Sequence, residues 1–198
     1  MQNARCKMQK VPRRALCSSF VAFCISHFAF CILVASEASA TVLLPADFTT
    51  IVTESRTIAH GRVIEVRSAL TGPRRTIESV VTVAVLEAIK GVAGQTVSFL
   101  IPNGQVGRYR RVLVGAPEFA EGDEVVVFLQ GRAPALPTLF GLSQGVYRVT
   151  RDASARSVVA PPPAAAANQR IVRGDPARRL MPIEVFTREI RGILARAQ

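Results

Sequence analysis

Few residues of this chain have the types and spacing that chemistry requires, and the clearest motif is Gly141-Leu-Ser143-Gln-Gly145. It matches the G-x-S-x-G pattern of a serine nucleophile, which follows a strand, precedes a helix and depends on a histidine later in the chain. Here the strand-like sequence Val146-Tyr-Arg-Val follows the serine, and His60 lies far upstream. We therefore predict that the two glycines shape a bend in a strand. A serine hydrolase that uses Ser143 remains the least favoured alternative.

Metal and acid–base chemistry are not predicted either. His60 is the only histidine outside the N-terminal segment, and a zinc site needs about three or four histidine, cysteine or carboxylate ligands. Carboxylates cluster at Glu118, Glu121, Asp123 and Glu124, but their spacing fits no calcium loop. The Gly-Asp pair inside this cluster is typical of a turn. We interpret the cluster as a solvated turn and His60 as a solvent-facing or hydrogen-bonded strand residue, and we expect no cofactor.

The densest basic patch is formed by Arg108, Tyr109, Arg110 and Arg111. Arginines with an interleaved aromatic ring can hold a polyanion or a single-stranded nucleic acid. The same residues can also form a charged edge strand that discourages aggregation, which is the interpretation we prefer. We take these four residues as the candidate binding patch, with polyanion binding as an alternative function.

The N-terminal segment has the order of a secretory signal peptide. Basic residues between Arg5 and Arg14 precede an apolar run over residues 16–35 and the small residues Ala38-Ser39-Ala40. Cleavage is therefore expected before Thr41, and retention of the run as a membrane anchor is the alternative. All 4 cysteines lie in this segment, so the cleaved chain has no disulfide and no thiolate ligand. We predict a secreted or periplasmic protein. Although its formal net charge is +11, such a protein is not expected to bind intracellular nucleic acid. It would contact a membrane only through the N-terminal segment, if that segment is not cleaved.

The elements that must position these residues are mainly strands. Alternation predicts a strand over residues 57–68, with Ile58, Ile64 and Val66 on one face and a bulge or bend at Gly61. A Gly-Pro turn at 70–75 leads into a valine-rich strand at 76–89 with two apolar faces. Further strands are predicted at 96–101, in a basic hairpin arm at 106–114, at 124–129, and as a strand or strand pair at 139–150. Asp47 is the expected N-cap of a short helix over 47–55.

The composition changes after residue 150. Residues 161–168 are rich in proline and alanine, which is typical of a linker. Ile183, Phe186, Ile190 and the pair Ile193/Leu194 then recur at helical spacing and predict an amphipathic helix that docks on the domain. The expected organisation is a signal peptide (1–40), a β-barrel domain (41–150), a Pro/Ala-rich linker (151–180) and an amphipathic C-terminal helix (181–198).

The predicted strands carry short motifs that resemble an exported bacterial family of unassigned function. The motifs are Gly61-Arg-Val63 in the first strand, Lys90-Gly91 after the second and Gly122-Asp-Glu-Val-Val126 before a late strand. More distantly, residues 46–150 resemble the netrin-like domain of tissue inhibitors of metalloproteinases. The resemblance implies a mainly β fold, a small closed OB-like barrel of about five strands with short flanking helices. Those inhibitors chelate zinc through an N-terminal cysteine, whereas Thr41 begins the cleaved chain here, so that mechanism is not expected.

These observations together favour binding over catalysis. The strands are well patterned and no catalytic set accompanies them. We predict a non-enzymatic, exported β-barrel module that binds a protein partner, such as a protease or an envelope component.

Overall fold

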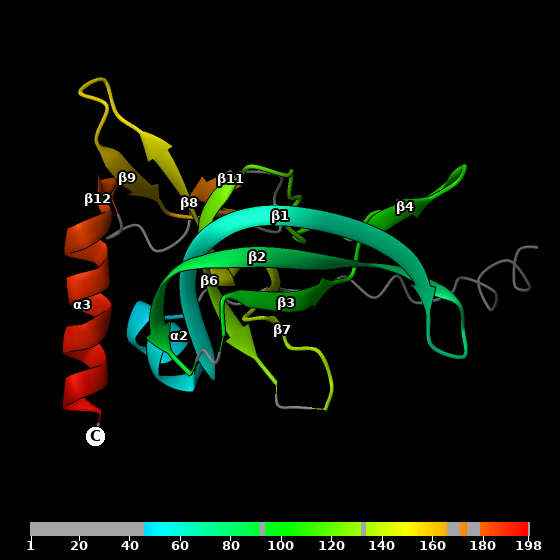
Figure 1. Cartoon of the computed structure of the whole chain (residues 1–198), viewed down its shortest axis with the longest axis horizontal. Helices are drawn as coiled ribbons and strands as arrows, with labels where there is room; N and C mark the ends of the chain where they lie inside the picture. Colours follow the sequence, from blue (N-terminus) through cyan, green and yellow to red (C-terminus); the bar gives the residue numbers. More distant parts are fainter. Residues whose placement is uncertain (1–45, 92–93, 132–133, 166–170, 174–178, 198) are drawn as a thin grey trace, which may run out of the picture. The chain divides into compact units, whose positions relative to one another are not determined.

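The computed structural model describes residues 46–91, 94–131, 134–165, 171–173 and 179–197 (Figure 1). The predicted signal peptide, its cleavage site before Thr41 and all 4 cysteines lie outside these residues. Within the described ranges, neither helix is long and apolar enough to cross a membrane.

Five strands close into a barrel, as the sequence predicted. Neighbouring strands around the barrel pair antiparallel, with one exception. The strand that contains Leu100 and the strand that contains Thr138 are parallel and pair at these two residues alone. The strands, in chain order, are β1 (Thr57–Thr71), β2 (Thr76–Lys90), β3 (Thr96–Ile101), β6 (Glu124–Gln130) and β7 (Thr138–Leu139). Closure occurs because β6 pairs with β1 on one edge and with β7 on the other.

The sheet does not stop at residue 150, where the sequence analysis placed the end of the barrel domain. Beyond β6 it continues through β8 (Val146–Arg151), β9 (Ser157–Ala160) and β12 (Met181–Pro182). A separate pair joins β10 (Pro163–Ala165) to β11 (Ile171–Arg173). Part of the segment expected to be a linker therefore forms strands, and its residues 166–170 and 174–178 lie outside the described part of the chain.

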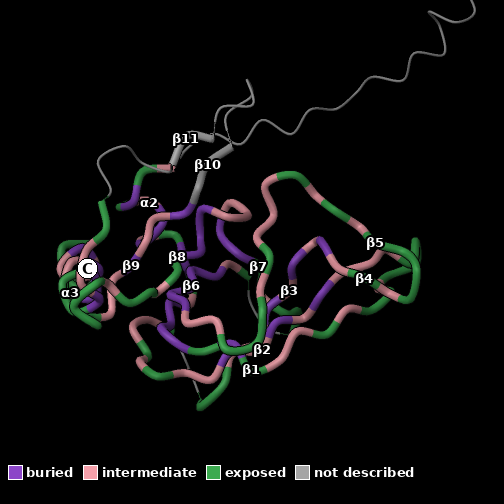
Figure 2. The backbone as a smooth tube through the Cα atoms, turned by 90° about the horizontal axis from the view of Figure 1, so that it is seen from above, coloured by how far each residue is buried: buried purple, intermediate pink, exposed green. Residues whose placement is uncertain are grey.

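Two apolar cores lie on opposite faces of β6. Inside the barrel, Val125, Val127 and Leu129 pack with residues such as Val81 and Phe99. The other face of β6 carries Val126 and Phe128, which pack against the two helices α2 (Phe48–Glu54) and α3 (Ile183–Arg196). The five residues Val125–Leu129 have no solvent exposure at all, and Figure 2 shows β6 among the buried parts of the chain.

Helix α2 is fixed at both ends. Asp47 is its N-cap, as predicted, and its carboxylate accepts a hydrogen bond from Thr49 N at 3.0 Å. At the other end, Lys90 Nζ donates to the carbonyl oxygens of Val52 (3.1 Å) and Thr53 (2.8 Å). These carbonyls have no partner within the helix, so the ammonium group satisfies them and joins the end of β2 to α2.

Gly91 has a positive φ of 60°, and a Cβ there would lie 2.2 Å from the carbonyl oxygen of Arg56. The Lys90-Gly91 motif therefore has a structural reason, because Lys90 binds the helix end and only glycine fits beside it.

Helix α3 docks on the outer face of the barrel, as its periodicity predicted. Ile183, Phe186, Ile190 and Ile193 are buried, whereas Leu194 is only partly buried. The Phe186 ring lies 4.9 Å from the Tyr147 ring, 5.4 Å from the Phe48 ring and 6.4 Å from the Phe128 ring. At the edge of this contact, Arg191 Nη2 lies 2.7 Å from Glu87 Oε1.

The predicted side-chain faces of β1 and β2 are wrong at two positions. Ile64 was expected in the core and is 49% exposed, and Leu86, on the predicted two-sided strand, is 58% exposed. The pairing of β1 with β2 shifts register twice here: Leu86 is skipped on β2 opposite His60 and Gly61, and Ile64 is skipped on β1 between Val63 and Glu65. Both are therefore the extra residues of bulges, and both are exposed. The first shift confirms the bulge predicted at Gly61, where a Cβ would also lie 2.3 Å from the carbonyl oxygen of Ala84.

We expect Phe186→Ala to lower the free energy of unfolding by about 3–5 kcal/mol, because it empties a fully enclosed aromatic site between α3 and the barrel. Val185→Ala on the exposed face of the same helix is the matched control and should change it by less than about 0.5 kcal/mol. Urea titration followed by circular dichroism measures both values. Equal effects of the two substitutions would contradict the docking of α3.

Candidate binding surface

The predicted basic patch lies on a small hairpin that rests against the far end of the β1–β2 hairpin (Figure 1). Its strands are β4 (Gly104–Val106) and β5 (Tyr109–Arg111), so the hairpin is shorter than the arm predicted for residues 106–114. Arg111 Nη1 donates to the carbonyl oxygen of Ile77 on β2 at 3.2 Å. Among the described strands β5 pairs with β4 alone, which agrees with its interpretation as a charged edge.

A pair of serines attaches this hairpin to β1 and β2. Ser68 Oγ and Ser79 Oγ are 2.8 Å apart, and Ser79 Oγ also donates to the carbonyl oxygen of Asn103 at 2.7 Å. The backbone N–H of Gln105 donates to Ser68 Oγ at 3.2 Å. Gly104 passes so close that a Cβ there would lie 2.4 Å from Ser79 Oγ. These contacts determine where the hairpin leaves the barrel.

Each residue of the patch has a defined contact. The Arg108 guanidinium lies 5.0 Å from the centre of the Tyr109 ring, and its Nη2 donates to Tyr109 Oη at 2.8 Å. Arg110 Nη2 lies 2.7 Å from Glu118 Oε1. Glu118 offsets the charge of Arg110, whereas Arg111 keeps its charge and is anchored to a backbone carbonyl of β2.

The hairpin and the segment that follows it contain apolar side chains that are largely exposed to solvent. Tyr109 is 62% exposed, and the segment that follows β5 exposes Val112 (65%) and Val114 (82%). Sequence reasoning treated the two valines as part of a strand. Because the strand ends at Arg111, both side chains have lost the sheet neighbours that would cover them. We call Arg108, Tyr109, Arg110, Val112 and Val114 the hairpin surface.

Two further exposed arginines were not identified from the sequence as candidate binding residues. Arg74 and Arg75 occupy the turn between β1 and β2, and both are exposed with no ion pair among the described residues. The carbonyl that Arg111 contacts belongs to Ile77, two residues after Arg75.

The acidic cluster is more than a solvated turn. Asp123 Oδ2 lies 2.6 Å from Arg148 Nη1, and Glu124 contacts both His60 Nε2 (2.9 Å) and Arg62 Nη2 (3.3 Å). The interpretation as a solvated turn holds for Glu121, which is exposed. In the described part of the chain, no group of three or more potential metal ligands comes together.

His60 is thus a hydrogen-bonded strand residue, one of its two predicted states. Its side chain is 11% exposed and is bonded to Glu124. Burial raises the pKa of Glu124, but the hydrogen bonds with His60 and Arg62 and the attraction of these side chains outweigh it, so the pKa lies below its ordinary value. The contact therefore stabilises an ionised carboxylate at the start of β6.

Ser143 does not lie in the context that a serine nucleophile needs. It belongs to the short 3-10 helix η1 (Leu142–Gly145), which leads directly into strand β8. Gly141 has a φ of 49°, and a Cβ at Gly145 would lie 2.7 Å from the carbonyl oxygen of Phe128. The backbone requires both glycines, but they lie at the two ends of a 3-10 helix between β7 and β8 and do not bend a strand as predicted.

Comparison with family models, curated proteins and solved structures finds no match to this chain. The residues themselves are therefore the basis for the function proposed below.

We expect Glu124→Gln to lower the free energy of unfolding near neutral pH by about 1 kcal/mol, because it weakens the contacts with His60 and Arg62. The lowered pKa means that ionised Glu124 stabilises the fold above the unfolded-state pKa of about 4.3, and that this contribution is lost as the pH falls through the folded-state pKa. The difference between variant and wild type should therefore shrink in acid. Urea titrations between neutral and acidic pH measure the difference in the free energy of unfolding between variant and wild type. Glu121→Gln, at an exposed position, is the control. A difference that grows in acid would contradict the assignment.

Proposed function

We propose that this chain is a non-enzymatic, exported module that binds a protein partner through the hairpin surface. The observation that carries the proposal is the exposure of Tyr109, Val112 and Val114 within six consecutive residues. Single exposed apolar residues are normal on a protein surface, whereas several in one short segment are typical of an interaction site. Burying these side chains against a partner removes their apolar surface from water, which is favourable.

The composition of the hairpin surface also favours a protein partner. Tyrosine and arginine are enriched at protein–protein interfaces and among the residues that contribute most to binding. Here the Arg108 guanidinium stacks on the Tyr109 ring, and Arg110 is held by Glu118. Side chains that are ordered before binding lose less conformational entropy when the partner arrives. The surface therefore combines apolar area with arginine groups that are already positioned.

Export and a netrin-like, OB-like relationship complete the proposal. A basic segment, an apolar run and Ala38-Ser39-Ala40 support cleavage before Thr41 and a secreted or periplasmic location. The resemblance is supported by the structural demands on its motif residues, since Gly61 forms a bulge and Lys90 binds the end of α2. An exported module of this kind would meet proteases or envelope components as partners.

The test is retention of a partner from periplasm or culture medium on the immobilised chain, with a triple variant in parallel. Tyr109→Ala combined with Val112→Ser and Val114→Ser removes the exposed apolar area, so we expect a partner retained in stoichiometric amount by the wild type to be lost. Quantitative mass spectrometry of the eluates measures the loss.

Ile64→Ser is the matched control, because Ile64 is an exposed apolar residue on β1, outside the hairpin surface. It should retain the partner as the wild type does. If no partner is enriched, or if the triple variant retains the partner fully, the proposal fails.

Polyanion binding is a second candidate, and a specific observation supports it. Arg74 and Arg75 in the β1–β2 turn and Arg108 on the hairpin are exposed and have no ion pair among the described residues, so two separate segments offer arginines to a polyanion. Binding to a polyanion through these groups releases counterions and depends steeply on salt.

We expect heparin retention of the wild type, if it occurs through these groups, to fall steeply with salt. The slope of log K against log[salt] is negative, and replacing Arg74, Arg75, Arg108 and Arg110 with alanine should reduce its magnitude by about 3. Replacing four arginines elsewhere, namely Arg56, Arg151, Arg188 and Arg196, gives a control of equal charge. A salt-insensitive interaction, or equal slopes for the two quadruple variants, would exclude this candidate.

A further inference from the structure

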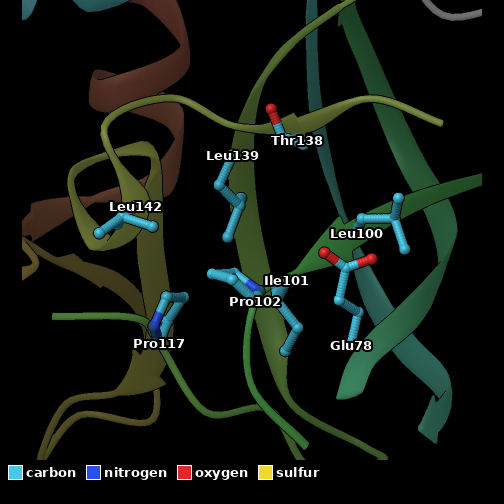
Figure 3. Close-up of a pocket in the computed structure, with 8 residues that line it drawn as sticks. All are labelled: Glu78, Leu100, Ile101, Pro102, Pro117, Thr138, Leu139 and Leu142. Atoms are coloured by element: carbon cyan, nitrogen blue, oxygen red, sulfur yellow. The ribbon is translucent and has the colours of Figure 1, made fainter. Parts of the chain in front are cut away.

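An apolar pocket of about 280 Å³ lies at the seam where β3 and β7 close the barrel (Figure 3). The seam is thin, because the two strands pair only at Leu100 and Thr138, supported by a hydrogen bond from Leu100 N to the carbonyl oxygen of Pro137 (2.9 Å). Its apolar lining consists of the buried core residues Ile101 and Leu139, together with Leu100, Pro102, Pro117 and Leu142. The two polar residues that line it are Thr138 and Glu78.

Leu142 takes an unfavourable backbone conformation at this pocket. Its φ is 57°, in the left-handed region that leucine rarely adopts. Figure 3 shows its side chain across the pocket from that of Leu100. The surrounding structure therefore holds this side chain at the pocket wall at the expense of backbone strain, and such strain is concentrated at functional sites.

Glu78 is the only charged residue among those that line the pocket. Its Oε2 accepts a hydrogen bond from Thr71 Oγ1. Among the described residues, no hydrogen-bond partner is found for Oε1, and Figure 3 shows the carboxylate beside Leu100. The pocket thus presents one negative group with acceptor capacity next to an otherwise apolar wall.

We propose that this pocket binds a small ligand that combines a bulky apolar body, aromatic or branched, with a single ammonium group. The apolar walls favour a ligand body that leaves water, and the Glu78 carboxylate favours a cation and repels an anion. Size is consistent, because an apolar cavity of about 150 Å³ already accepts benzene. This site is separate from the hairpin surface, so the proposal does not rest on the protein-binding function.

A free ligand fits this pocket better than a lysine or arginine side chain from a partner. Those side chains are narrow and unbranched, and one of them would leave much of the pocket unfilled. A void next to apolar walls forfeits the dispersion contacts that would reward binding. We therefore assign the pocket to a small molecule.

The test compares three probes of similar shape and different charge: phenethylammonium, 2-phenylethanol and phenylacetate. Each is titrated into the full-length chain and followed by NMR chemical shifts or calorimetry. We expect phenethylammonium to bind about tenfold tighter than 2-phenylethanol, which loses the charged hydrogen bond to Glu78, and phenylacetate to bind most weakly. Absence of binding by the ammonium probe, or equal affinity for it and the alcohol, would overturn the proposal.

Two variants assign the effect to this site. Glu78→Gln keeps the shape of the side chain and should make the ammonium and the alcohol bind equally. Glu54→Gln removes the same charge from the exposed end of α2 and should leave the tenfold preference unchanged. Thr138→Trp fills the pocket from an exposed strand position and should abolish binding of all probes. Retention of the preference in Glu78→Gln would overturn the proposal whether or not Thr138→Trp folds.

Discussion

The burial of β6 on both faces is the constraint on which the rest of the structure depends. Val125, Val127 and Leu129 belong to the barrel interior, while Val126 and Phe128 belong to the core under α2 and α3. The backbone of the same strand pairs with β1 on one edge and with β7 and β8 on the other. One strand therefore closes the barrel and carries the helix layer, so a defect in β6 would loosen both cores together.

Polar contacts determine how the loops leave this framework. Lys90 holds the end of α2, Asp123 pairs with Arg148, and Glu124 binds His60 where β6 begins. Without these contacts, the last carbonyl groups of α2 and the side chains of Arg148 and His60 would lose the partners that the structure gives them. Asp123 and Glu124, which could have indicated catalysis, therefore contribute to the architecture, whereas Tyr109, Val112 and Val114 on the β4–β5 hairpin and the segment after it remain exposed.

Much of the fold could be predicted because local patterns and global packing agree. The valines of β6, the Asp47 cap and the helical spacing of Phe186 and Ile190 each reflect an element whose neighbours require the same residues. Ile64 of β1 and Leu86 of β2 were mispredicted because each is the extra residue of a bulge, which regular alternation does not anticipate, and both are exposed.

Residue types and periodicity thus determined that this chain is mainly β with an amphipathic C-terminal helix, the family resemblance implied the barrel, and the sequence located a basic patch at Arg108, Arg110 and Arg111. Only the tertiary structure decided what surrounds them. It ended β5 at Arg111 and left Val112 and Val114 uncovered. It also brought Glu78 of β2 and Leu142, more than sixty residues later in the chain, to opposite sides of one pocket. The reason is that these contacts depend on strand register and barrel closure, which bring together segments distant in sequence. Even for β6, whose apolar run was evident from the sequence, the closed barrel decided which core each side chain enters.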